Sequence, residues 1–276
     1  MRILFSNSVK LIVFLLIISS CSTDHATKTD EQLEHEMVLK HRIKSITDYK
    51  TDIQFGVEQK EQISHVQNFD ESGWKQKETT YSDGSLTSIL TFNYDEKGNL
   101  LKVNATEPNG TVLFNITKNY YENNLRKEYY FYLPDGTYKY RNFATYDKSG
   151  KMTELKYYWP DGLKAINKYK YDGNKKTEDT EYAPDGKFRY NWVYKYDKND
   201  NLIEAIQYYP GNKINGKIIY EYDLNNLLVK QTIYFEESVT NIFTFTYNEK
   251  KILSSKTTLT SFGHLSEKIR YAYEFY

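Results

Sequence analysis

The fold is decided by residues 171–196, which read YDGNKKTEDTEYAPDGKFRYNWVYKY. This stretch holds two turn signals, Tyr171-Asp172-Gly173-Asn174 at its start and Pro184-Asp185-Gly186 near its centre. In the second signal, proline presets φ for the first corner, aspartate caps its own backbone, and glycine takes the left-handed position that closes a three-residue hairpin loop. In the first signal, glycine and asparagine tolerate positive φ at the opposite hairpin end. Strands must therefore lie on both sides of each turn.

The strand after the second turn alternates clearly. Every second residue is aromatic, namely Phe188, Tyr190, Trp192, Tyr194 and Tyr196. The intervening positions include Arg189, Asn191 and Lys195. Because a period of two is typical of a half-buried strand, this pattern predicts one aromatic face and one solvated face.

Both turn signals recur along the chain. A tyrosine-acid motif returns in steps of 25, 27, 25, 25, 25, 26 and 25 residues, at Phe69-Asp70, Tyr94-Asp95, Tyr121-Glu122, Tyr146-Asp147, Tyr171-Asp172, Tyr196-Asp197, Tyr222-Asp223 and Tyr247-Asn248. All five prolines occupy the equivalent midway turn, at Pro108, Pro134, Pro160, Pro184 and Pro210. Such a period indicates a repeat protein whose unit is two strands and two turns.

The Pro-Asp-Gly loops also predict a register. Treating them as three-residue loops pairs Tyr132 with Tyr138 and Tyr182 with Phe188. One step further from the loop, the same register pairs Tyr130 with Tyr140 and Glu181 with Arg189. All four are sensible cross-strand partners.

The repeat predicts an all-β fold, an antiparallel meander of hairpins in one large sheet. About eight units from residue 69, preceded by a capping hairpin of residues 42–47 and 62–66 with its tip at Phe55-Gly56, make 16 to 18 strands. At about 4.8 Å per strand the flat sheet would be roughly 80 Å wide, so twist should curl it into a spiral or partly closed tube with the aromatic face inward. We expect a short helix at residues 29–41 and no second domain.

The motifs Tyr94-Asp95-Glu96-Lys97-Gly98-Asn99-Leu100 and Tyr146-Asp147-Lys148-Ser149-Gly150 resemble the tyrosine-aspartate (YD, or Rhs) repeats of bacterial envelope and toxin-shell proteins. The resemblance covers about residues 68–276. The unit here is longer and adds the Pro-Asp-Gly turn, which is closer to MORN-type hairpin repeats. What the resemblance implies is an alternative function, that of an immunity or shell-like accessory protein of a secreted toxin system.

The N-terminus resembles a lipoprotein signal. Arg2 and Lys10 precede an apolar run at residues 11–18, which is too short to span a bilayer. The ending Ile18-Ser19-Ser20-Cys21 resembles the lipobox of bacterial lipoproteins, in which the cysteine is diacylated and becomes the first residue of the mature chain. We therefore predict a signal peptide at residues 1–20, lipid attachment at Cys21, a flexible tether at 21–38 and a repeat domain at 39–276. The alternative is a plain signal peptide with an incidental cysteine.

Composition limits the partners. Residues 1–20 carry two basic residues and no acidic ones, so the mature chain keeps 35 Lys plus Arg against 37 Asp plus Glu, a net charge of about −2. We expect no nucleic-acid partner, because the chain lacks the basic excess that phosphate binding needs. By analogy with studied lipoproteins, Ser22 after the cysteine favours the outer membrane of a Gram-negative bacterium, and both the periplasmic and the surface-exposed side stay open.

The sequence contains no convincing catalytic or metal motif, so we expect no enzyme activity and no cofactor. His35-Glu36 and His41 are six residues apart, whereas the zinc-protease helix needs histidines four apart. The segment 197–201 begins like a calcium loop, but Leu202 and Tyr208 stand where glycine and glutamate are needed. The Asp residues at the turns are best explained as local caps.

The remaining candidate site is aromatic. Trp159, Tyr190, Trp192 and Tyr194 could stack on a carbohydrate, and the alternative is packing inside the curled sheet. Together with the lipid anchor and the repeat surface, these residues favour a non-enzymatic, lipid-anchored cell-envelope binding or scaffold protein with a protein or glycan partner.

Overall fold

A computed structural model describes residues 30–276. The expected signal peptide, Cys21 and the first part of the expected tether lie outside the described residues. The elements are α1 (Asp30–His41), β1 (Ile43–Gln54), β2 (Val57–Glu58), β3 (Gln62–Phe69), β4 (Lys75–Ser82), β5 (Ser85–Tyr94), β6 (Leu100–Thr106), β7 (Val112–Tyr120), β8 (Arg126–Tyr132), β9 (Tyr138–Tyr146), β10 (Met152–Trp159), β11 (Gly162–Asp172), β12 (Lys175–Tyr182), β13 (Phe188–Tyr196), β14 (Leu202–Tyr209), β15 (Lys213–Tyr222), β16 (Leu228–Phe235), β17 (Ser238–Tyr247), β18 (Leu253–Thr260) and β19 (Leu265–Phe275).

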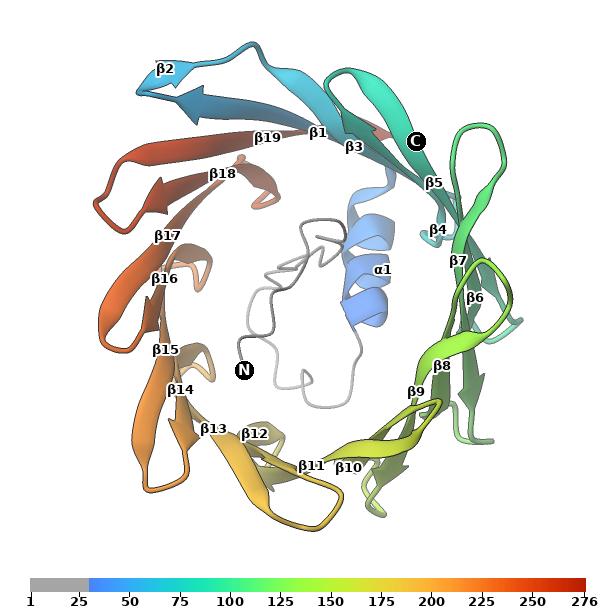
Figure 1. Ribbon diagram of the computed structural model, residues 1–276. Helices are drawn as coiled ribbons and strands as arrows, with labels where there is room; N and C mark the ends of the chain where they lie inside the picture. Colours follow the sequence, from blue (N-terminus) through green and yellow to red (C-terminus); the bar gives the residue numbers. More distant parts are fainter. Residues whose placement is uncertain (1–29) are drawn as a thin grey trace.

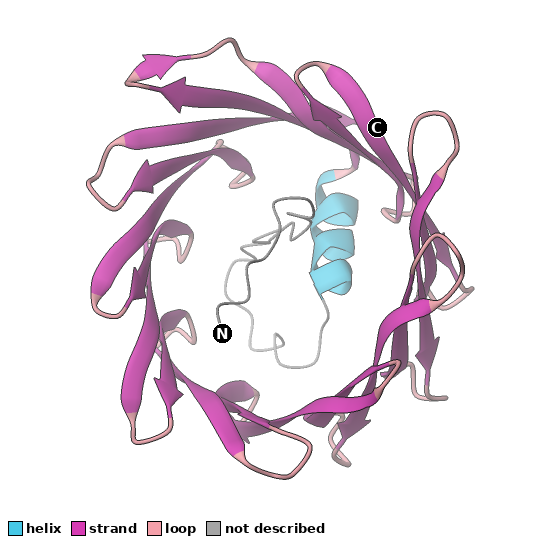
Figure 2. Ribbon diagram, in the orientation of Figure 1, coloured by secondary structure: helices cyan, strands magenta, loops and turns pink. Residues whose placement is uncertain are grey.

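The sheet is an antiparallel meander that closes on itself. From β3 to β19 each strand pairs with the next one along the chain, and β1 pairs with both β3 and β19. Eighteen strands therefore form a closed barrel, while the two-residue β2 pairs only with the end of β1. The predicted all-β hairpin meander and its tubular curvature are confirmed (Figures 1 and 2).

The hairpin at the start of the repeat domain has a different role from the one predicted. β1 and β3 do form a hairpin with its tip at Phe55-Gly56. However, β1 is not a cap, because its other edge pairs with β19 in a register that runs from Ile43 opposite Phe275 to Asp52 opposite Glu267. Closing the ring satisfies the backbone groups that an edge strand would leave open.

The helix α1 lies inside the barrel (Figure 2). Its Val38 is buried against Ile43 and Ile46 of β1, Phe69 of β3 and Ile252. A short N-terminal helix was predicted, and α1 also includes residues 30–38 of the expected tether. Within residues 30–276, no helix has the length and apolar character needed to cross a membrane.

The inner face of the sheet can be followed from residue to residue. Lys118 of β7 bonds Glu31 of α1, so its face is the inner one. Residues that oppose one another on neighbouring strands share a face, and the first run of them is Lys118, Tyr129, Asn142, Tyr157 and Ala165. Tyr169 lies on the same face of β11 as Ala165, four residues away. From Tyr169 the opposed residues continue through Asp179, Trp192, Gln207 and Gly216. The face that holds Tyr190, Trp192 and Tyr194 of β13 therefore points into the barrel.

The predicted hairpin register is right at the loop and wrong one step beyond it. Tyr132 opposes Tyr138, but Tyr130 opposes Arg141 and Phe131 opposes Tyr140. Likewise Tyr182 opposes Phe188, whereas Glu181 opposes Tyr190 instead of Arg189. A β-bulge beside each Pro-Asp-Gly turn inserts one residue, and a one-residue slip moves every side chain beyond it to the other face.

The two kinds of turn lie at opposite ends of the barrel, which we call the Tyr-Asp end and the Pro-Asp-Gly end. At the Tyr-Asp end, Oδ1 of Asp95 accepts hydrogen bonds from the backbone N–H groups of Lys97 and Asn99 at 2.9 and 2.8 Å.

The predicted motif Tyr121-Glu122 is displaced by one residue. The backbone of Tyr121 bonds Leu125 and Asn124 in the same way as the backbone of Asp95 bonds Asn99 and Gly98. Tyr120, and not Tyr121, is therefore the equivalent of Tyr94.

Candidate functional site

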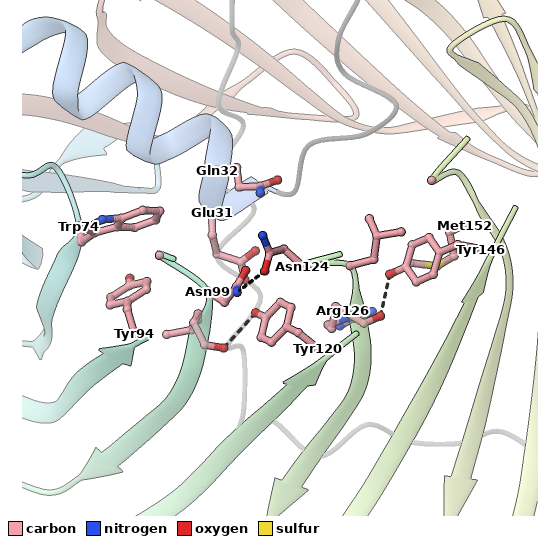
Figure 3. Close-up of a pocket in the computed structure, with 14 residues that line it drawn as sticks. Glu31, Gln32, Trp74, Tyr94, Asn99, Tyr120, Asn124, Arg126, Tyr146 and Met152 are labelled. Atoms are coloured by element: carbon pink, nitrogen blue, oxygen red, sulfur yellow. Dashed lines mark hydrogen bonds between the residues drawn. The ribbon is translucent and has the colours of Figure 1, made fainter. Parts of the chain in front are cut away.

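A cavity of about 150 Å³ lies between the start of α1 and the inner wall at the Tyr-Asp end (Figure 3). Residues of α1 and of the strand ends and turns from β4 to β10 line it, namely Glu31, Gln32, Trp74, Tyr94, Gly98, Asn99, Leu100, Tyr120, Asn124, Leu125, Arg126, Tyr146, Gly150 and Met152. It is smaller than the 300–1,000 Å³ of typical drug-sized ligand pockets. A single small polar group or sugar ring is therefore the scale of ligand it suits.

Two of the three tyrosines of this cavity, Tyr120 and Tyr146, belong to a repeated hydrogen-bond ladder. The hydroxyl of Tyr120 donates to the carbonyl oxygen of Leu100 at 3.0 Å, and Tyr146 donates to Arg126 at 2.8 Å. Equivalent bonds recur around the barrel from Tyr171, Tyr196, Tyr222, Tyr247 and Tyr273. The repeated tyrosine thus fixes each ring along the inner wall and leaves its face available at the cavity.

Amide side chains form the polar side of the cavity. Asn99 Nδ2 donates to Asp95 Oδ2 at 2.8 Å and reaches Asn124 Oδ1 at 3.3 Å, as the dashed line between the two amides in Figure 3 shows. Asn99 is buried, and Asn124 adopts a φ of 63°. These contacts orient the amides, which can both donate and accept hydrogen bonds.

A stacked aromatic group covers another side. The Trp74 ring stacks on His35 of α1 with centroids 3.6 Å apart and packs against Tyr94 at 4.9 Å. His35 also bonds the carbonyl oxygen of Ser72 at 2.8 Å. A Cβ atom on Gly98 would meet the Trp74 ring at 2.3 Å, so glycine is needed there for space as well as for its φ of 80°.

The charges around the cavity are partly paired. Glu31 accepts a bond from the buried Lys118. The guanidinium of Arg126 makes no ion pair within residues 30–276; it hydrogen-bonds the Tyr146 side chain and lies 5.9 Å from the centroid of the Tyr129 ring. The pKa values of Tyr94 and Tyr120 are raised, mainly by burial and further by the carboxylates of α1. Both phenols therefore stay protonated, and Arg126 is the cation that a ligand could bind.

A second charged group fixes the helix behind this cavity. Lys75 of β4 lies 2.9 Å from Glu34 of α1 and 3.4 Å from Glu78, and all three side chains are buried. Burial alone lowers the pKa of Lys75, but the Glu34 and Glu78 carboxylates outweigh it and leave that pKa raised. This group has no cavity of its own and acts in holding α1.

Three of the four predicted binding residues come together elsewhere on the inner wall. Tyr190, Trp192 and Tyr194 share the inner face of β13, beside Asp179 and Lys176 of β12. Lys176 Nζ lies 4.8 Å from the centroid of the Tyr194 ring and 5.5 Å from that of Tyr169. Burial raises the pKa of Asp179 and lowers that of Lys176.

Trp159 is separate from this group. It ends β10 at the Pro-Asp-Gly end, is 55% exposed, and lies 5.5 Å from Lys164. None of the four predicted residues lines the cavity of Figure 3. Tyr94 and Tyr146 belong to the predicted repeat motif, which indicated only a turn, and Tyr120 directly precedes the predicted motif position Tyr121. Nothing in the sequence indicated a role for Glu31, Gln32 or Arg126.

The other motifs have local roles. Asp197 Oδ1 accepts the N–H groups of Asn199 and Asn201 at 2.8 and 2.9 Å, which is the cap of a hairpin turn. Within residues 30–276, no three His, Cys, Asp or Glu side chains gather closely enough to hold a metal ion.

No protein-family model matches the chain, and no curated protein sequence matches it. Among solved structures, a porin-like protein from Bacteroides uniformis aligns with a TM-score of 0.47 at 12% identity, over 85% of this chain and 97% of its own. A porin-like protein from Bacteroides vulgatus gives 0.42 at 14%, over 84% and 98%. The TcdB2–TccC3 structure gives 0.36 at 12%, over 73% of this chain and 13% of its own. These values carry no information about a ligand or an activity.

Proposed function

We propose that this chain is a non-enzymatic, lipid-anchored binding protein of the bacterial cell envelope, and that its ligand is a glycan. The observation that carries the proposal is the cavity of Figure 3, which places aromatic rings, amides and the Arg126 guanidinium, which has no carboxylate partner within residues 30–276, around one small space. Aromatic rings offer flat apolar faces to a sugar ring, while amides and a guanidinium match its hydroxyl and acidic groups.

The donor set of the cavity favours binding over hydrolysis. Of the residues that line it, Glu31 alone is acidic, and Lys118 already bonds its carboxylate. Most glycosidases need two carboxyl groups that flank the scissile bond. The amides of Asn99 and Asn124 orient a ligand without exchanging protons.

The outer wall supports a barrel that stands in water and is held at the membrane by its anchor. Ion pairs lie on the outer face: Lys156–Glu154 at 2.9 Å in the middle of β10, and Lys170–Glu178 and Lys230–Glu221, each at 2.8 Å, between neighbouring strands nearer the Tyr-Asp end. Such charges are costly on a lipid-facing surface and ordinary on a hydrated one. Attachment through Cys21 then accounts for the envelope location.

The anchor is tested by metabolic labelling with a fatty acid in a Gram-negative host. We expect the wild-type chain to be labelled and the Cys21→Ser chain to stay unlabelled and unprocessed. Label on the Cys21→Ser chain would refute the anchor.

Glycan binding is tested on the mature chain from residue 21 with Cys21→Ser, first on a glycan array and then by calorimetry with the best ligand. Arg126→Met should lower the affinity for that ligand at least about tenfold, which is the usual cost of losing a charge-assisted hydrogen bond. Lys102→Met, on the exposed face of β6, is the matched control and should change nothing. Binding to no glycan, or equal loss in both variants, would contradict the proposed ligand. The toxin-accessory alternative stays a prediction, and it requires a neighbouring toxin gene.

A further inference from the structure

The hairpin tips at the Pro-Asp-Gly end fall into two groups. Six consecutive tips each carry an exposed aromatic side chain, and we call these residues the aromatic rim: Phe55, Trp159, Phe188, Tyr209, Phe235 and Phe262. The three other tips at this end, at residues 82–85, 107–111 and 133–137, are fully described and carry none. In Figure 1 the rim follows one side of the barrel, from the β10–β11 tip through β18–β19 to β2.

Two rim residues make no packing contribution that could explain them. Phe55 is 105% exposed and Phe262 is 86% exposed. Phe55 also adopts a φ of 53°, in the region that favours asparagine or glycine and strains a bulky side chain. A strained, solvent-facing phenylalanine lowers stability, which points to a contact made outside the chain.

The spacing of the rim indicates the kind of partner. Adjacent tips are two strands apart, so the rings stand roughly 10 Å from one another at about 4.8 Å per strand. A protein partner usually meets a compact central patch of anchors. Separate aromatic wedges on hairpin tips instead suit the interfacial layer of a bilayer, which needs no complementary shape and where tryptophan and tyrosine are enriched.

The charges beside the rim are internally balanced. Lys164 pairs with Asp161 at 2.5 Å, Lys187 pairs with Asp185 at 2.8 Å, and Lys213 lies 3.9 Å from Glu236. These pairs give the tips no net attraction for anionic headgroups. Association through the rim must therefore come from the aromatic rings.

We propose that the aromatic rim inserts into the interfacial layer of a phospholipid bilayer, so that the barrel stands with its Pro-Asp-Gly end on the membrane. The inference uses the proposed Cys21 anchor only as a source of membrane proximity. Cys21 precedes Asp30 by nine residues, which can extend up to ~30 Å, comparable to a strand of eight or nine residues. This orientation leaves the cavity at the Tyr-Asp end facing away from the membrane.

The test uses the mature chain from residue 21 with Cys21→Ser, so that no lipid is attached, and vesicles of phosphatidylcholine. We expect this chain to co-sediment with the vesicles. The double variant Phe55→Ser, Phe262→Ser should lower vesicle affinity at least about tenfold, since each lost ring removes buried apolar area. Raising the salt from about 0.1 M to about 1 M, which shortens the Debye length from ~10 to ~3 Å, should leave binding intact.

The matched control is Leu101→Ser, Leu224→Ser, at two exposed positions of the Tyr-Asp end, and it should bind vesicles as the parent does. All four positions are exposed, and circular dichroism verifies that both variants fold. A parent that does not bind vesicles, equal loss in both variants, or a rim-dependent dimer in sedimentation velocity without vesicles would each overturn the inference. Glycan binding, measured without vesicles on the same chain, fails or succeeds independently.

Discussion

Lys75 Nζ lies 2.9 Å from Glu34 Oε1, and this contact joins the wall of the barrel to the helix inside it. Both side chains are less than a tenth exposed, and Glu78 adds a second carboxylate 3.4 Å from the same ammonium. A buried ion pair is costly to form but far more costly to break, because the remaining charge keeps no partner and little water. The position of α1, and with it the cavity, therefore depends on Lys75.

Lys75→Met should lower the free energy of unfolding by about 3–5 kcal/mol, the usual effect of removing one partner from a buried pair. Urea denaturation followed by tryptophan fluorescence measures it. The control is Lys230→Met, whose exposed pair with Glu221 should contribute about 0–1 kcal/mol. A loss below about 1 kcal/mol in Lys75→Met would show that α1 is held by its apolar contacts alone.

Asp48 predicts a specific pH dependence. Burial raises its pKa to about 7, the Glu78 carboxylate adds to this, and Lys75 and Lys256 oppose it. His65 of β3 stands directly opposite Asp48. Because the folded pKa is above the unfolded value near 3.8, the contribution of Asp48 to stability is complete below about pH 4 and is lost as the pH rises to about 7.

Asp48→Asn cannot ionise, so it should be close to neutral at pH 4 and more stable than wild type at pH 8. The gain is at most about 4 kcal/mol, from 1.36 kcal/mol for each pH unit between the two pKa values. Urea denaturation at both pH values measures it, with the exposed Asp172→Asn as the control. A difference between wild type and Asp48→Asn that does not change with pH would exclude Asp48 as the titrating group.

The tyrosine ladder can be tested at one step. The hydroxyl of Tyr196 donates to the carbonyl oxygen of Lys176 at 2.9 Å. Tyr196→Phe should cost about 0.5–1.5 kcal/mol, because the ring stays and one hydrogen bond is lost. Tyr194→Phe is the matched control, since no hydrogen bond of its hydroxyl is found among residues 30–276, and its thermal midpoint should change less. Equal shifts in the two variants would mean that the ladder adds nothing beyond ring packing.

The hairpins were predictable from local chemistry, because each turn is specified by three or four residues. Pro134-Asp135-Gly136 shows this well, with Gly136 at a φ of 83° and Asp135 Oδ1 accepting the N–H of Thr137 at 2.9 Å. The bulge beside that turn has no such local signature, so the register failed at Tyr130 while it held at Tyr132. On the outer face this places Arg141 5.9 Å from the Tyr130 ring and 5.4 Å from the Tyr158 ring, where only solvated residues were expected.

Two features could not be predicted from the repeat: the closure of the barrel and the presence of the cavity. Both depend on contacts between residues far apart in the sequence. β1 meets β19 across more than 200 residues, and nothing in either strand distinguishes a ring from a spiral. Glu31 and Lys118 are 87 residues apart, and the hydrophobic pattern of α1 is too weak to show which side faces the wall. The repeat therefore predicted the wall of the barrel, and the sequence also indicated the helix, but the position of that helix inside the barrel could only be seen in three dimensions.

Two glycines separate the role of space from that of backbone conformation. Gly98 and Gly136 have nearly equal φ values of 80° and 83°, so alanine at either position is strained by about 1–2 kcal/mol. A Cβ atom at Gly136 meets nothing within 4 Å, whereas at Gly98 it would overlap the Trp74 ring, which is held between His35 and Tyr94. Gly98→Ala should therefore lower the thermal midpoint more than Gly136→Ala and shift the near-ultraviolet signal of Trp74. Because Trp74 also lines the cavity, Gly98→Ala should lower the affinity for the glycan that Arg126 binds, whereas Gly136→Ala should not. An equal loss of glycan affinity in the two variants would contradict the assigned role of Trp74.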